Sequence, residues 1–389
     1  MTTQDQPLAR PGANIAQLDD LGDVDGKRVL VRADFNVPLS NGEITDDLRI
    51  RAALPTLRWL QERGAVVTAM SHLGRPKGEP NPAFDIAPVR ARLDELLPGI
   101  TLLENLRFDP GEKANDPAFV AKLVDGQDLY VNDAFGACHR AHASIVGPPA
   151  HLPSAAGKLL SKEIEILVGV RNEARRPFVA IMGGSKVSDK VAVIEALAER
   201  VDSLLIGGGM AFTFFAAMGN PVGNSLLEES MVDYCRELLD SDKPIVLPSD
   251  VTALGPGGEL FNPDAGGEVR QVGQSVPDGW MGVDIGPGTA AEFSDIIAEA
   301  QTVLWNGPVG VFEDVRFEAG TRQIAQAVSE TSGFSVVGGG DSAAAAKQFG
   351  LDDDMAHVSI GGGASLELLE KGDLPGLAAL RGEFTPEEG

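Results

Sequence analysis

Cysteine is scarce in this sequence of 389 residues, which holds only Cys138 and Cys235. Two cysteines at no metal-ligand spacing exclude a disulfide framework and a zinc site as organising features of the fold. Long hydrophobic runs are also missing, and no run approaches the ~18 apolar residues that a membrane-spanning helix needs. Because the first 17 residues lack the apolar stretch of a secretory signal, we expect a protein of the reducing cytoplasm.

Positive charge is in short supply, since 57 Asp and Glu oppose 32 Lys and Arg and leave a formal net charge of −25. A surface of this sign repels nucleic acids and anionic membranes, so we expect neither as a partner. It also repels free anionic metabolites, and an anion site would need a local concentration of Arg, Lys or His. Aromatic residues make up only 5%, whereas 43% of residues are hydrophobic and glycine occurs 46 times. This composition allows sizeable cores and many close turns.

Short apolar runs alternate with longer amphipathic stretches along most of the chain. The runs include Val29–Val31, Val66–Met70, Leu102–Leu103, Leu129–Val131, Phe178–Met182, Leu204–Ile206, Ile245–Leu247, Val303–Trp305, Phe334–Val337 and His357–Ile360. The amphipathic stretches include Leu48–Arg63, Val187–Glu199 and Thr321–Ser332. Strands alternating with helices at this spacing predict an α/β protein with doubly wound, Rossmann-like parallel sheets.

One segment breaks this alternation. Residues 157–174 read as a single long helix between the Pro-rich stretch 147–156 and Arg175–Pro177, where a new strand follows. We therefore predict a first domain over residues 1–156, a connecting helix over 157–175 and a second domain over 176–373. The two domains would be joined by this helix as a hinge.

Basic and polar side chains follow the predicted strands of the N-terminal half. They are Arg32, Asp34, Asn36, Arg49, His72, Arg75, Arg107, His139, Arg140 and His142. Open α/β sheets bind ligands outside the carboxyl ends of their strands, and guanidinium groups bind phosphate and carboxylate oxygens bidentately. Any one arginine is more simply explained by a surface ion pair. As a set, they favour a cup for a small, multiply charged anion.

Glycine clusters follow the predicted strands of the C-terminal half. They are Gly183–Gly184, Gly207–Gly209, Gly307, Gly338–Gly340 and Gly361–Gly363. Glycine lets the backbone approach a ligand closely, and fresh helix N-termini offer N–H groups to phosphate. Lys186 and Lys190 lie four residues apart after the first cluster, on what we predict to be the first turns of a helix, where point charges suit a triphosphate. A single glycine turn is usually structural, but the set favours a nucleotide platform.

Two other functions fit parts of this pattern. The string Gly338–Ala343 matches the loose GxGxxA form of an NAD-dependent dehydrogenase, although the nearest acids, Asp352–Asp354, fit poorly. A non-enzymatic, two-lobed anion-binding protein would share hinged α/β lobes but would need an export signal. A Walker A motif is absent, which argues against a P-loop enzyme.

Several long strings in fixed order resemble the phosphoglycerate kinase family. They are RVLVRADFNVPL, SHLGRP, LLENLRF, NDAFGACHRAH, GGSKVSDK, VLWNGPVGVFE and VVGGGDSAAA, collinear from about residue 18 to about residue 380. The resemblance implies a monomeric glycolytic enzyme that transfers a phosphoryl group reversibly between 1,3-bisphosphoglycerate and ADP, giving 3-phosphoglycerate and MgATP. It implies charge stabilisation in a closed interdomain cleft, and a C-terminal segment, residues 374–389, that returns to the first domain.

The resemblance also implies a role for individual residues. The first domain would bind 3-phosphoglycerate through Asp34, Phe35, Asn36, Arg49, His72, Leu73, Gly74, Arg75, Arg107 and Arg140. The second would bind ATP or ADP through Lys190, Gly208, Gly209, Glu313, Gly339, Gly340, Asp341 and Ser342, with Glu313 at the ribose and Asp341 at Mg²⁺. Catalysis would fall to Arg49, Lys186 and Lys190, which balance charge on the moving phosphoryl group.

Overall fold

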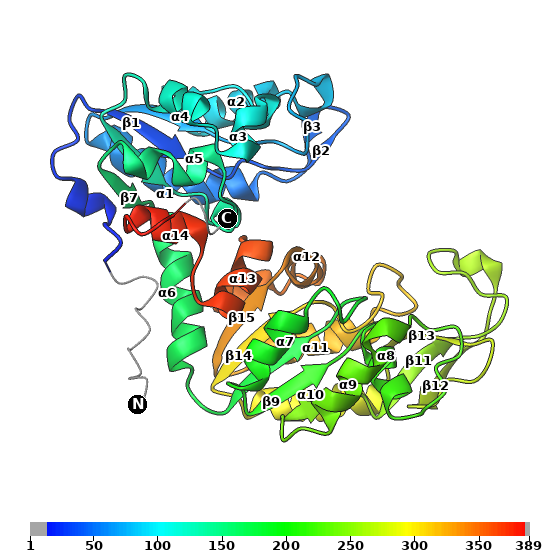
Figure 1. Cartoon of the computed structure of the whole chain (residues 1–389). Helices are drawn as coiled ribbons and strands as arrows, with labels where there is room; N and C mark the ends of the chain where they lie inside the picture. Colours follow the sequence, from blue (N-terminus) through cyan, green and yellow to red (C-terminus); the bar gives the residue numbers. More distant parts are fainter. Residues whose placement is uncertain (1–13, 386–389) are drawn as a thin grey trace, which may run out of the picture. The chain divides into compact units, whose positions relative to one another are not determined.

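The computed structural model describes residues 14–385, and its chain divides into two compact units (Figure 1). Unit 1 contains the described residues up to Val168 together with those from Lys371 onward. Unit 2 runs from Gly169 to Glu370. Each unit is built on a parallel sheet with helices around it, so the predicted α/β fold class is confirmed.

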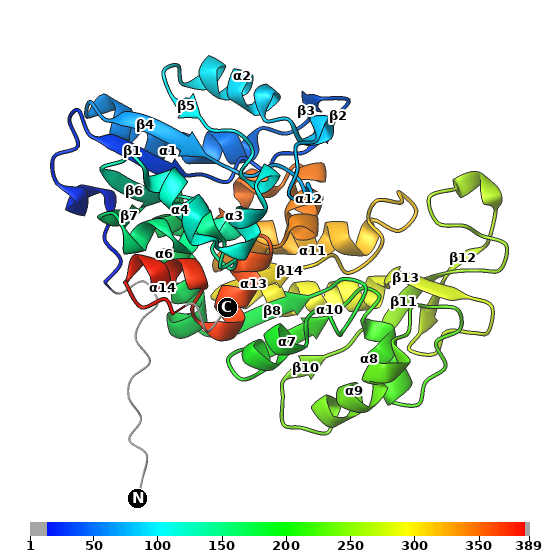
Figure 2. The ribbon, with the colours of Figure 1, turned by 45° about the horizontal axis from the view of Figure 1, so that its top comes forward.

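Unit 1 is organised by a five-stranded sheet in the order β5-β4-β1-β6-β7, which Figure 2 shows side by side. The strands are β5 (Thr101–Leu102), β4 (Val66–Met70), β1 (Arg28–Arg32), β6 (Leu129–Asn132) and β7 (Ser154–Ala156), and all neighbours are parallel. Parallel sheets are covered on both faces, which explains why these strands are short apolar runs. All their carboxyl ends therefore meet at one edge.

The two faces of this sheet carry separate cores, because successive residues of a strand point to opposite faces. Val29 and Val31 pack with helices α1 (Leu48–Glu62) and α2 (Ala87–Leu96), whereas Leu30 packs on the other face near α4 (Pro117–Val124). The other small elements of unit 1 are β2 (Leu39–Ser40), β3 (Glu43–Ile44), α3 (Pro110–Ala114), α5 (Ala143–Val146) and the 3-10 helices η1 (Leu18–Leu21), η2 (Pro82–Phe84), η3 (Leu106–Phe108), η4 (Phe135–Ala137) and η5 (Pro148–Ala150).

The end of the chain completes unit 1. Helix α14 (Pro375–Leu380) packs against α5 and β7. The Gly376 amide donates a hydrogen bond of 2.9 Å to the Cys138 carbonyl, and Leu377 is fully buried. The long predicted helix is present as α6 (Lys158–Glu173), and the division between the units falls inside it, after Val168.

Unit 2 contains a six-stranded parallel sheet in the order β10-β9-β8-β14-β15-β16. Its strands are β10 (Ile245–Val246), β9 (Ser203–Ile206), β8 (Phe178–Met182), β14 (Thr302–Asn306), β15 (Phe334–Gly338) and β16 (His357–Val358). Helices α10 (Pro287–Ala298), α11 (Ala319–Glu330) and α12 (Gly340–Gln348) contribute to one core with these strands. The remaining helices are α7 (Val191–Ala198), α8 (Ala211–Ala217), α9 (Val232–Leu239) and α13 (Gly363–Lys371), with 3-10 helices η6 (Glu229–Met231), η7 (Pro263–Ala265) and η8 (Asp352–Asp354).

A three-stranded antiparallel sheet in unit 2 was not expected from the sequence. Its order is β12 (Val269–Gly273), β11 (Asp250–Leu254), β13 (Met281–Ile285). It packs with Phe212 and Phe215 of α8. Strand β12 is almost entirely exposed, so it lacks the apolar run that identifies a strand. Between residues 14 and 385, no helix is long and apolar enough to span a membrane.

Candidate active site

Arg32, the last residue of β1, lies fully buried at the carboxyl edge of the unit 1 sheet. Its Nε donates a 2.9 Å hydrogen bond to Ser144 Oγ, its Nη2 lies 3.0 Å from His72 Nδ1, and its Nη1 donates to the Ala33 carbonyl. All three nitrogens of the guanidinium therefore contact other groups of the protein. Because Arg32 is also fully buried, we expect it to hold the neighbouring site residues in place rather than to bind a ligand.

Glu112, a fully buried carboxylate of α3, is the negative group linked to Arg32 through Ser144. It accepts hydrogen bonds from the Ser144 amide at 2.9 Å and from Ser144 Oγ at 2.7 Å, and it lies 3.8 Å from His142 Nδ1. Ser144 Oγ thus donates to Glu112 and accepts from Arg32. A buried ion needs a partner and satisfied hydrogen bonds, and this relay supplies both.

Asp34 and Arg49 form the next layer of the site. Arg49, the second residue of α1, donates from Nη1 to Asp34 Oδ2, and the Asp34 side chain is only 5% exposed. Burial alone would raise the pKa of Asp34, but the charges of Arg49 and Arg32 hold it below its ordinary value. Burial lowers the pKa of His72 well below its usual range, so that its imidazole is neutral.

Hydrogen bonds tie the loops that follow β1, β4 and β5 to one another. Asn36 Oδ1 accepts from the Gly74 amide at 2.8 Å, and Arg107 Nη1 donates to the Gly74 carbonyl at 2.7 Å. Asn105 exchanges two hydrogen bonds with the Leu73 backbone, at 3.1 and 2.8 Å. The loops that follow three neighbouring strands are therefore hydrogen-bonded to one another, as expected for strands that end at the same edge of a sheet.

Arg107 carries the clearest sign of an anion site. Its Nε is buried and has no hydrogen-bond partner among the residues that the structure describes. Burial and the neighbouring charge of Arg32 lower the pKa of Arg107. Burial, together with Arg107, Arg32 and Arg140, lowers the pKa of His142 to about 3. Positive groups from several strand ends thus gather in the anion cup, which we define as Asp34, Asn36, Arg49, His72, Arg107, Arg140 and His142.

The other predicted substrate residues differ in exposure. Phe35 and Leu73 are buried in the core of unit 1, so a ligand could meet only their backbone. The Phe35 amide is itself taken by Ser71 Oγ at 2.8 Å. Arg75 and Arg140 are exposed. The charge of Arg140 acts on Arg107 and on His142, which places it in the cup, whereas the role of Arg75 stays a prediction.

Unit 2 holds a small cavity of about 220 Å³ at the carboxyl ends of β14, β15 and β16, called here the glycine cavity. Its lining is Lys190, Asn306, Gly307, Gly339, Gly340, Asp341, Ser342, Gly362, Gly363 and Leu366. Helices α12 and α13 both begin there, at Gly340 and Gly363. First-turn N–H groups lack intrahelical partners and favour anions, so two helix N-termini converge on one space.

Lys190 forms the polar wall of the glycine cavity. Its Nζ donates to the Gly183 carbonyl at 2.7 Å, to the Asn306 carbonyl at 3.1 Å and to Asn306 Oδ1 at 2.5 Å. Burial lowers the pKa of Lys190 to about 8, against the opposing charges of Asp341 and Asp189. The ammonium joins the loops after β8 and β14.

Four predicted residues, Lys186, Gly208, Gly209 and Glu313, do not line this cavity. Lys186 and Glu313 are exposed on the loops after β8 and β14. Gly208 has φ +69° and packs so closely that a Cβ would lie 2.8 Å from the Gly184 amide nitrogen. The loop after β9 is therefore pressed against the loop after β8, beside the cavity rather than around it.

The predicted helix over residues 187–199 begins later than expected. Helix α7 starts at Val191, with Lys190 as its N-cap, so the prediction that Lys186 and Lys190 share the first turns of a helix is wrong. Residues 187–190 instead form a separate turn, in which the Lys190 amide donates to the Val187 carbonyl at 2.9 Å. The carboxylate of Glu228 accepts from the amides of Val187 and Ser188 in this turn.

The residues of the glycine cavity fit a magnesium ion that arrives with a nucleotide. In residues 14–385, no group of three His, Cys, Asp or Glu could hold a metal alone. Asp341, however, lines the cavity in the first turn of α12. Mg²⁺ is commonly held by one or two carboxylates, waters and substrate phosphates, and one carboxylate beside two helix N-termini meets this requirement.

Sequence reasoning assigned no individual role to several residues near the sites. Gly362 and Gly363 belong to a cluster that the sequence placed at the nucleotide platform, and Asn306 directly precedes Gly307 of another. Glu112 and Glu228 had no such signal. Their hydrogen-bond partners lie 32 and 40 or more residues away, and the chain contains 57 acidic residues.

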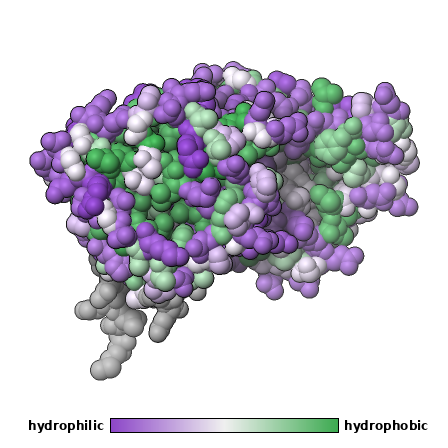
Figure 3. All heavy atoms as spheres, turned by 90° about the horizontal axis from the view of Figure 1, so that it is seen from above, coloured by the Kyte–Doolittle hydropathy of each residue, from purple (hydrophilic) through white to green (hydrophobic). Residues whose placement is uncertain are grey.

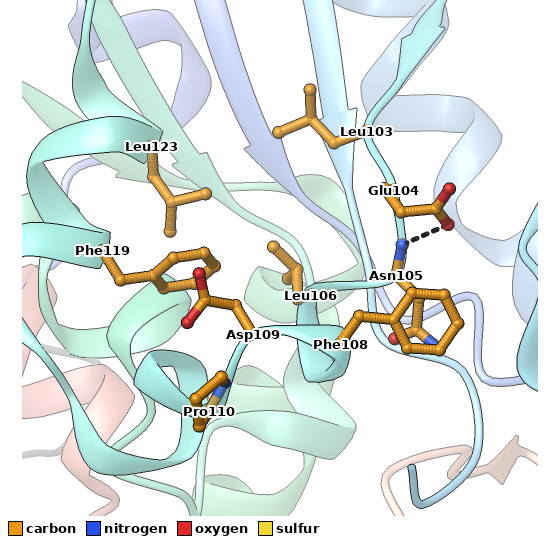
Figure 4. Close-up of a pocket in the computed structure, with 9 residues that line it drawn as sticks. All are labelled: Leu103, Glu104, Asn105, Leu106, Phe108, Asp109, Pro110, Phe119 and Leu123. Atoms are coloured by element: carbon orange, nitrogen blue, oxygen red, sulfur yellow. Dashed lines mark hydrogen bonds between the residues drawn. The ribbon is translucent and has the colours of Figure 1, made fainter. Parts of the chain in front are cut away.

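A third hollow, a groove of about 410 Å³ in unit 1, has a different character. Figure 3 shows apolar atoms gathered among polar ones on the face of the molecule that it presents. In Figure 4, Leu103, Leu106, Phe119 and Leu123 surround the groove on one side, with Asn105 and Phe108 on the other. None of the predicted ligand-binding residues lines it, and its apolar walls do not suit an anion.

Comparison with known proteins gives a consistent result. The profile of a family described as phosphoglycerate kinase matches residues 18–100 and 98–372. A phosphoglycerate kinase of Rubrobacter xylanophilus is 51% identical over 381 residues, covering 91% of this chain and 95% of that protein. A phosphoglycerate kinase of Salinispora tropica is also 51% identical, over 400 residues, covering 94% and 99%.

Solved structures agree with these relatives. The structure of phosphoglycerate kinase from Coxiella burnetii is 36% identical, with a TM-score of 0.86, and the match covers 95% of this chain and 100% of that one. The phosphoglycerate kinase of Pyrococcus horikoshii OT3 is 30% identical, with a TM-score of 0.81 and the same coverage.

Proposed function

The chain belongs to the phosphoglycerate kinase family, whose members are phosphotransferases of glycolysis, and on this premise we propose which of its residues bind the two substrates and move the phosphoryl group. The reaction is reversible transfer between 1,3-bisphosphoglycerate and ADP, which gives 3-phosphoglycerate and MgATP. With the family established, the dehydrogenase and the non-enzymatic binding protein are set aside.

The anion cup binds 3-phosphoglycerate. The observation that carries this proposal is the buried Nε of Arg107, which lies among positive neighbours and has no partner in the part of the chain that the structure describes. A buried donor without an acceptor is costly, and a phosphate or carboxylate oxygen would satisfy it. The predicted ligands stand as proposed: Asp34, Phe35, Asn36, Arg49, His72, Leu73, Gly74, Arg75, Arg107 and Arg140.

The glycine cavity binds the phosphates of ATP or ADP. Support comes from the two helix N-termini and the Lys190 ammonium that meet there. Gly339, Gly340 and Ser342 would offer backbone and hydroxyl groups, Gly208 and Gly209 would lie towards the adenine, and Glu313 towards the ribose. When bound, Mg²⁺ would neutralise charge on the phosphate oxygens, and Asp341 is the carboxylate placed to hold it.

Charge stabilisation, rather than proton transfer, drives the proposed mechanism. The nucleophile is the carboxylate of 3-phosphoglycerate, which is ionised at pH 7 because carboxyl groups titrate near 4. No general base is needed, because the attacking carboxylate has already lost its proton. Arg49, Lys186 and Lys190 offset the repulsion between the two polyanions and stabilise the transferring group.

Phosphoryl transfer requires the attacking carboxylate and the γ-phosphate to be in contact. The cup belongs to unit 1 and the glycine cavity to unit 2, so we propose that turnover closes a cleft between the two units around both ligands. Small-angle X-ray scattering should detect compaction only with both ligands bound. Scattering that is unchanged by both ligands together would contradict closure.

We propose further that the enzyme is a cytoplasmic monomer that takes small-molecule substrates and binds neither nucleic acids nor membranes. Phosphorus-31 NMR of the chain with MgATP and 3-phosphoglycerate tests the activity. New resonances of ADP and of an acyl phosphate are expected. If the spectrum does not change, while a known phosphoglycerate kinase under the same conditions produces these resonances, the proposed function is overturned.

A further inference from the structure

One carboxylate holds the turn between the two catalytic lysines proposed above. Glu228 Oε2 accepts hydrogen bonds from the Val187 amide at 2.6 Å and the Ser188 amide at 3.1 Å, and Glu228 Oε1 accepts from Ser188 Oγ at 2.6 Å. Lys186 immediately precedes this turn, and Lys190 closes it by donating its amide to the Val187 carbonyl at 2.9 Å. The loop after β8 is thus fastened by a residue 40 positions away.

Glu228 is itself fixed to a rigid element. Its amide donates to Thr213 Oγ1 at 3.2 Å, and Thr213 is buried within α8. Burial would raise the pKa of Glu228, but the hydrogen bonds of the turn and the charge of Lys186 keep it below its ordinary value. The carboxylate is therefore ionised at neutral pH and bridges a helix to the lysine loop.

The loop needs such support because of its own sequence. It opens with Gly183 and Gly184, and Gly184 has φ +112°, a conformation that few other residues adopt. A lysine stabilises a transferring group only while its backbone keeps the ammonium in place, and a displacement of about 1 Å can cost ~10²-fold in rate. Lys190 is also held by its own three side-chain bonds, whereas Lys186 is exposed. The carboxylate therefore matters most for Lys186.

We propose that Glu228 is a positioning residue for phosphoryl transfer, which fixes the Val187–Ser188 turn so that Lys186 meets the transferring group. This inference rests on the proposed catalytic role of Lys186. It assigns a kinetic function to a residue outside the anion cup and the lining of the glycine cavity.

Glu228→Gln tests the inference, with Glu229→Gln as the matched control because Glu229 is the exposed neighbour. The amide nitrogen of glutamine would face N–H donors that now meet a carboxylate oxygen. We expect kcat to fall roughly 10- to 100-fold with little change in the KM for 3-phosphoglycerate, and we expect Glu229→Gln to match the wild type. Equal kcat values for the two variants would overturn the inference.

A double-mutant cycle separates positioning from general support of the fold. If Glu228 acts through Lys186, Glu228→Gln should cost little more in a Lys186→Ala background, whereas independent losses that multiply would contradict it. Lys186→Ala alone tests the proposed function: an unchanged kcat there would refute the role of the lysine. If kcat falls strongly in Lys186→Ala but is unchanged in Glu228→Gln, the role of Glu228 is refuted and the role of Lys186 is retained.

Should Glu228→Gln fail to fold, Ser188→Ala provides a milder test. It removes only the 2.6 Å hydrogen bond from Ser188 Oγ and leaves both backbone bonds in place. A few-fold loss of kcat is expected for one charge-assisted hydrogen bond, again without an effect on the KM for 3-phosphoglycerate. An unaltered kcat would count against the inference.

Discussion

Arg49 and Asp34 are paired across the end of the unit 1 sheet, where the first turn of α1 meets the residues after β1. The Asp34 side chain is 5% exposed and the Arg49 side chain 30% exposed. A buried carboxylate that loses its partner is strongly destabilised. The ion pair therefore has two effects: it stabilises the buried carboxylate of Asp34, and it holds the guanidinium of Arg49 beside the anion cup.

Arg49→Ala should lower kcat by about 10³- to 10⁵-fold, the range measured for an arginine that stabilises a phosphoryl transition state. The nucleotide Kd should change little, because the glycine cavity lies in the other unit. Steady-state kinetics and calorimetric titration with ADP measure the two quantities. Arg49→Lys, which keeps the charge, should lose less, and an unchanged kcat in Arg49→Ala would refute the assigned role.

Arg107→Ala should weaken binding of 3-phosphoglycerate by roughly 10- to 100-fold, the effect of one or two charge-assisted hydrogen bonds. The reason is the buried Nε, which has no hydrogen-bond partner within residues 14–385. Arg107→Lys should not restore affinity, because an ammonium cannot bind an oxyanion bidentately. Calorimetry with 3-phosphoglycerate checks this, with ADP as the control ligand. Wild-type affinity in Arg107→Ala would show that the donor faces no ligand.

Lys190 should make ADP binding depend on pH. Its pKa is lowered to about 8 by burial, so its positive charge is lost as the pH rises through that value. Bound phosphate favours the charged form, and the Kd for ADP should therefore rise towards tenfold per pH unit above pH 8. Binding of 3-phosphoglycerate should lack this step, as should ADP binding to Lys190→Met. A flat ADP profile between pH 7 and 9 would contradict the prediction.

Ionisation of the buried Asp133 carboxyl should lower the free energy of unfolding as the pH rises. It is fully buried after β6, where its Oδ1 accepts from the amides of Leu159 and Leu160 at 2.9 and 3.2 Å. Burial raises its pKa from 3.8 to about 7. Between these values the folded state keeps a proton that the unfolded state has lost, so the contribution of Asp133 to stability is present below about pH 4 and lost by about pH 7.

Asp133→Asn should remove that loss. The stability difference between variant and wild type should grow in favour of the variant from pH 4.5 to pH 8, by about 3 kcal/mol at most. Thermal and denaturant melts at several pH values measure it, with the exposed Asp125→Asn as control. A difference that stays constant across this range would mean that Asp133 ionises in the folded protein as it does in the unfolded chain.

Much of the fold could be predicted because buried parallel strands consist of uninterrupted apolar residues. The predicted runs Val66–Met70 and Phe178–Met182 agree with β4 and β8 residue for residue. Strand β12 could not be found this way, since it is exposed along nearly its whole length. The start of α7 was misplaced because the amphipathic pattern from Val187 onward does not reveal that residues 187–190 form a separate turn, which hydrogen-bonds to the distant carboxylate of Glu228.

In the candidate sites, too, the sequence pattern predicted some residues, whereas others depend on contacts between distant parts of the chain. Lys190 and the run Gly339–Ser342 lie together because parallel strands end at one edge, which the alternation of strands and helices already implies. The relay of Glu112, Ser144 and Arg32 depends on three-dimensional packing between α3, α5 and β1. No spacing in the sequence distinguishes that glutamate from the other acidic residues.

The return of α14 to unit 1 bears on how the protein is made. During translation, Ala134, Ile145 and Val146 emerge from the ribosome long before Ala379, which completes their apolar cluster. Unit 2, whose residues end at Glu370, is fully synthesised before this last helix is available. The apolar patch of the first unit therefore stays uncovered until α14 has been synthesised, after all of unit 2.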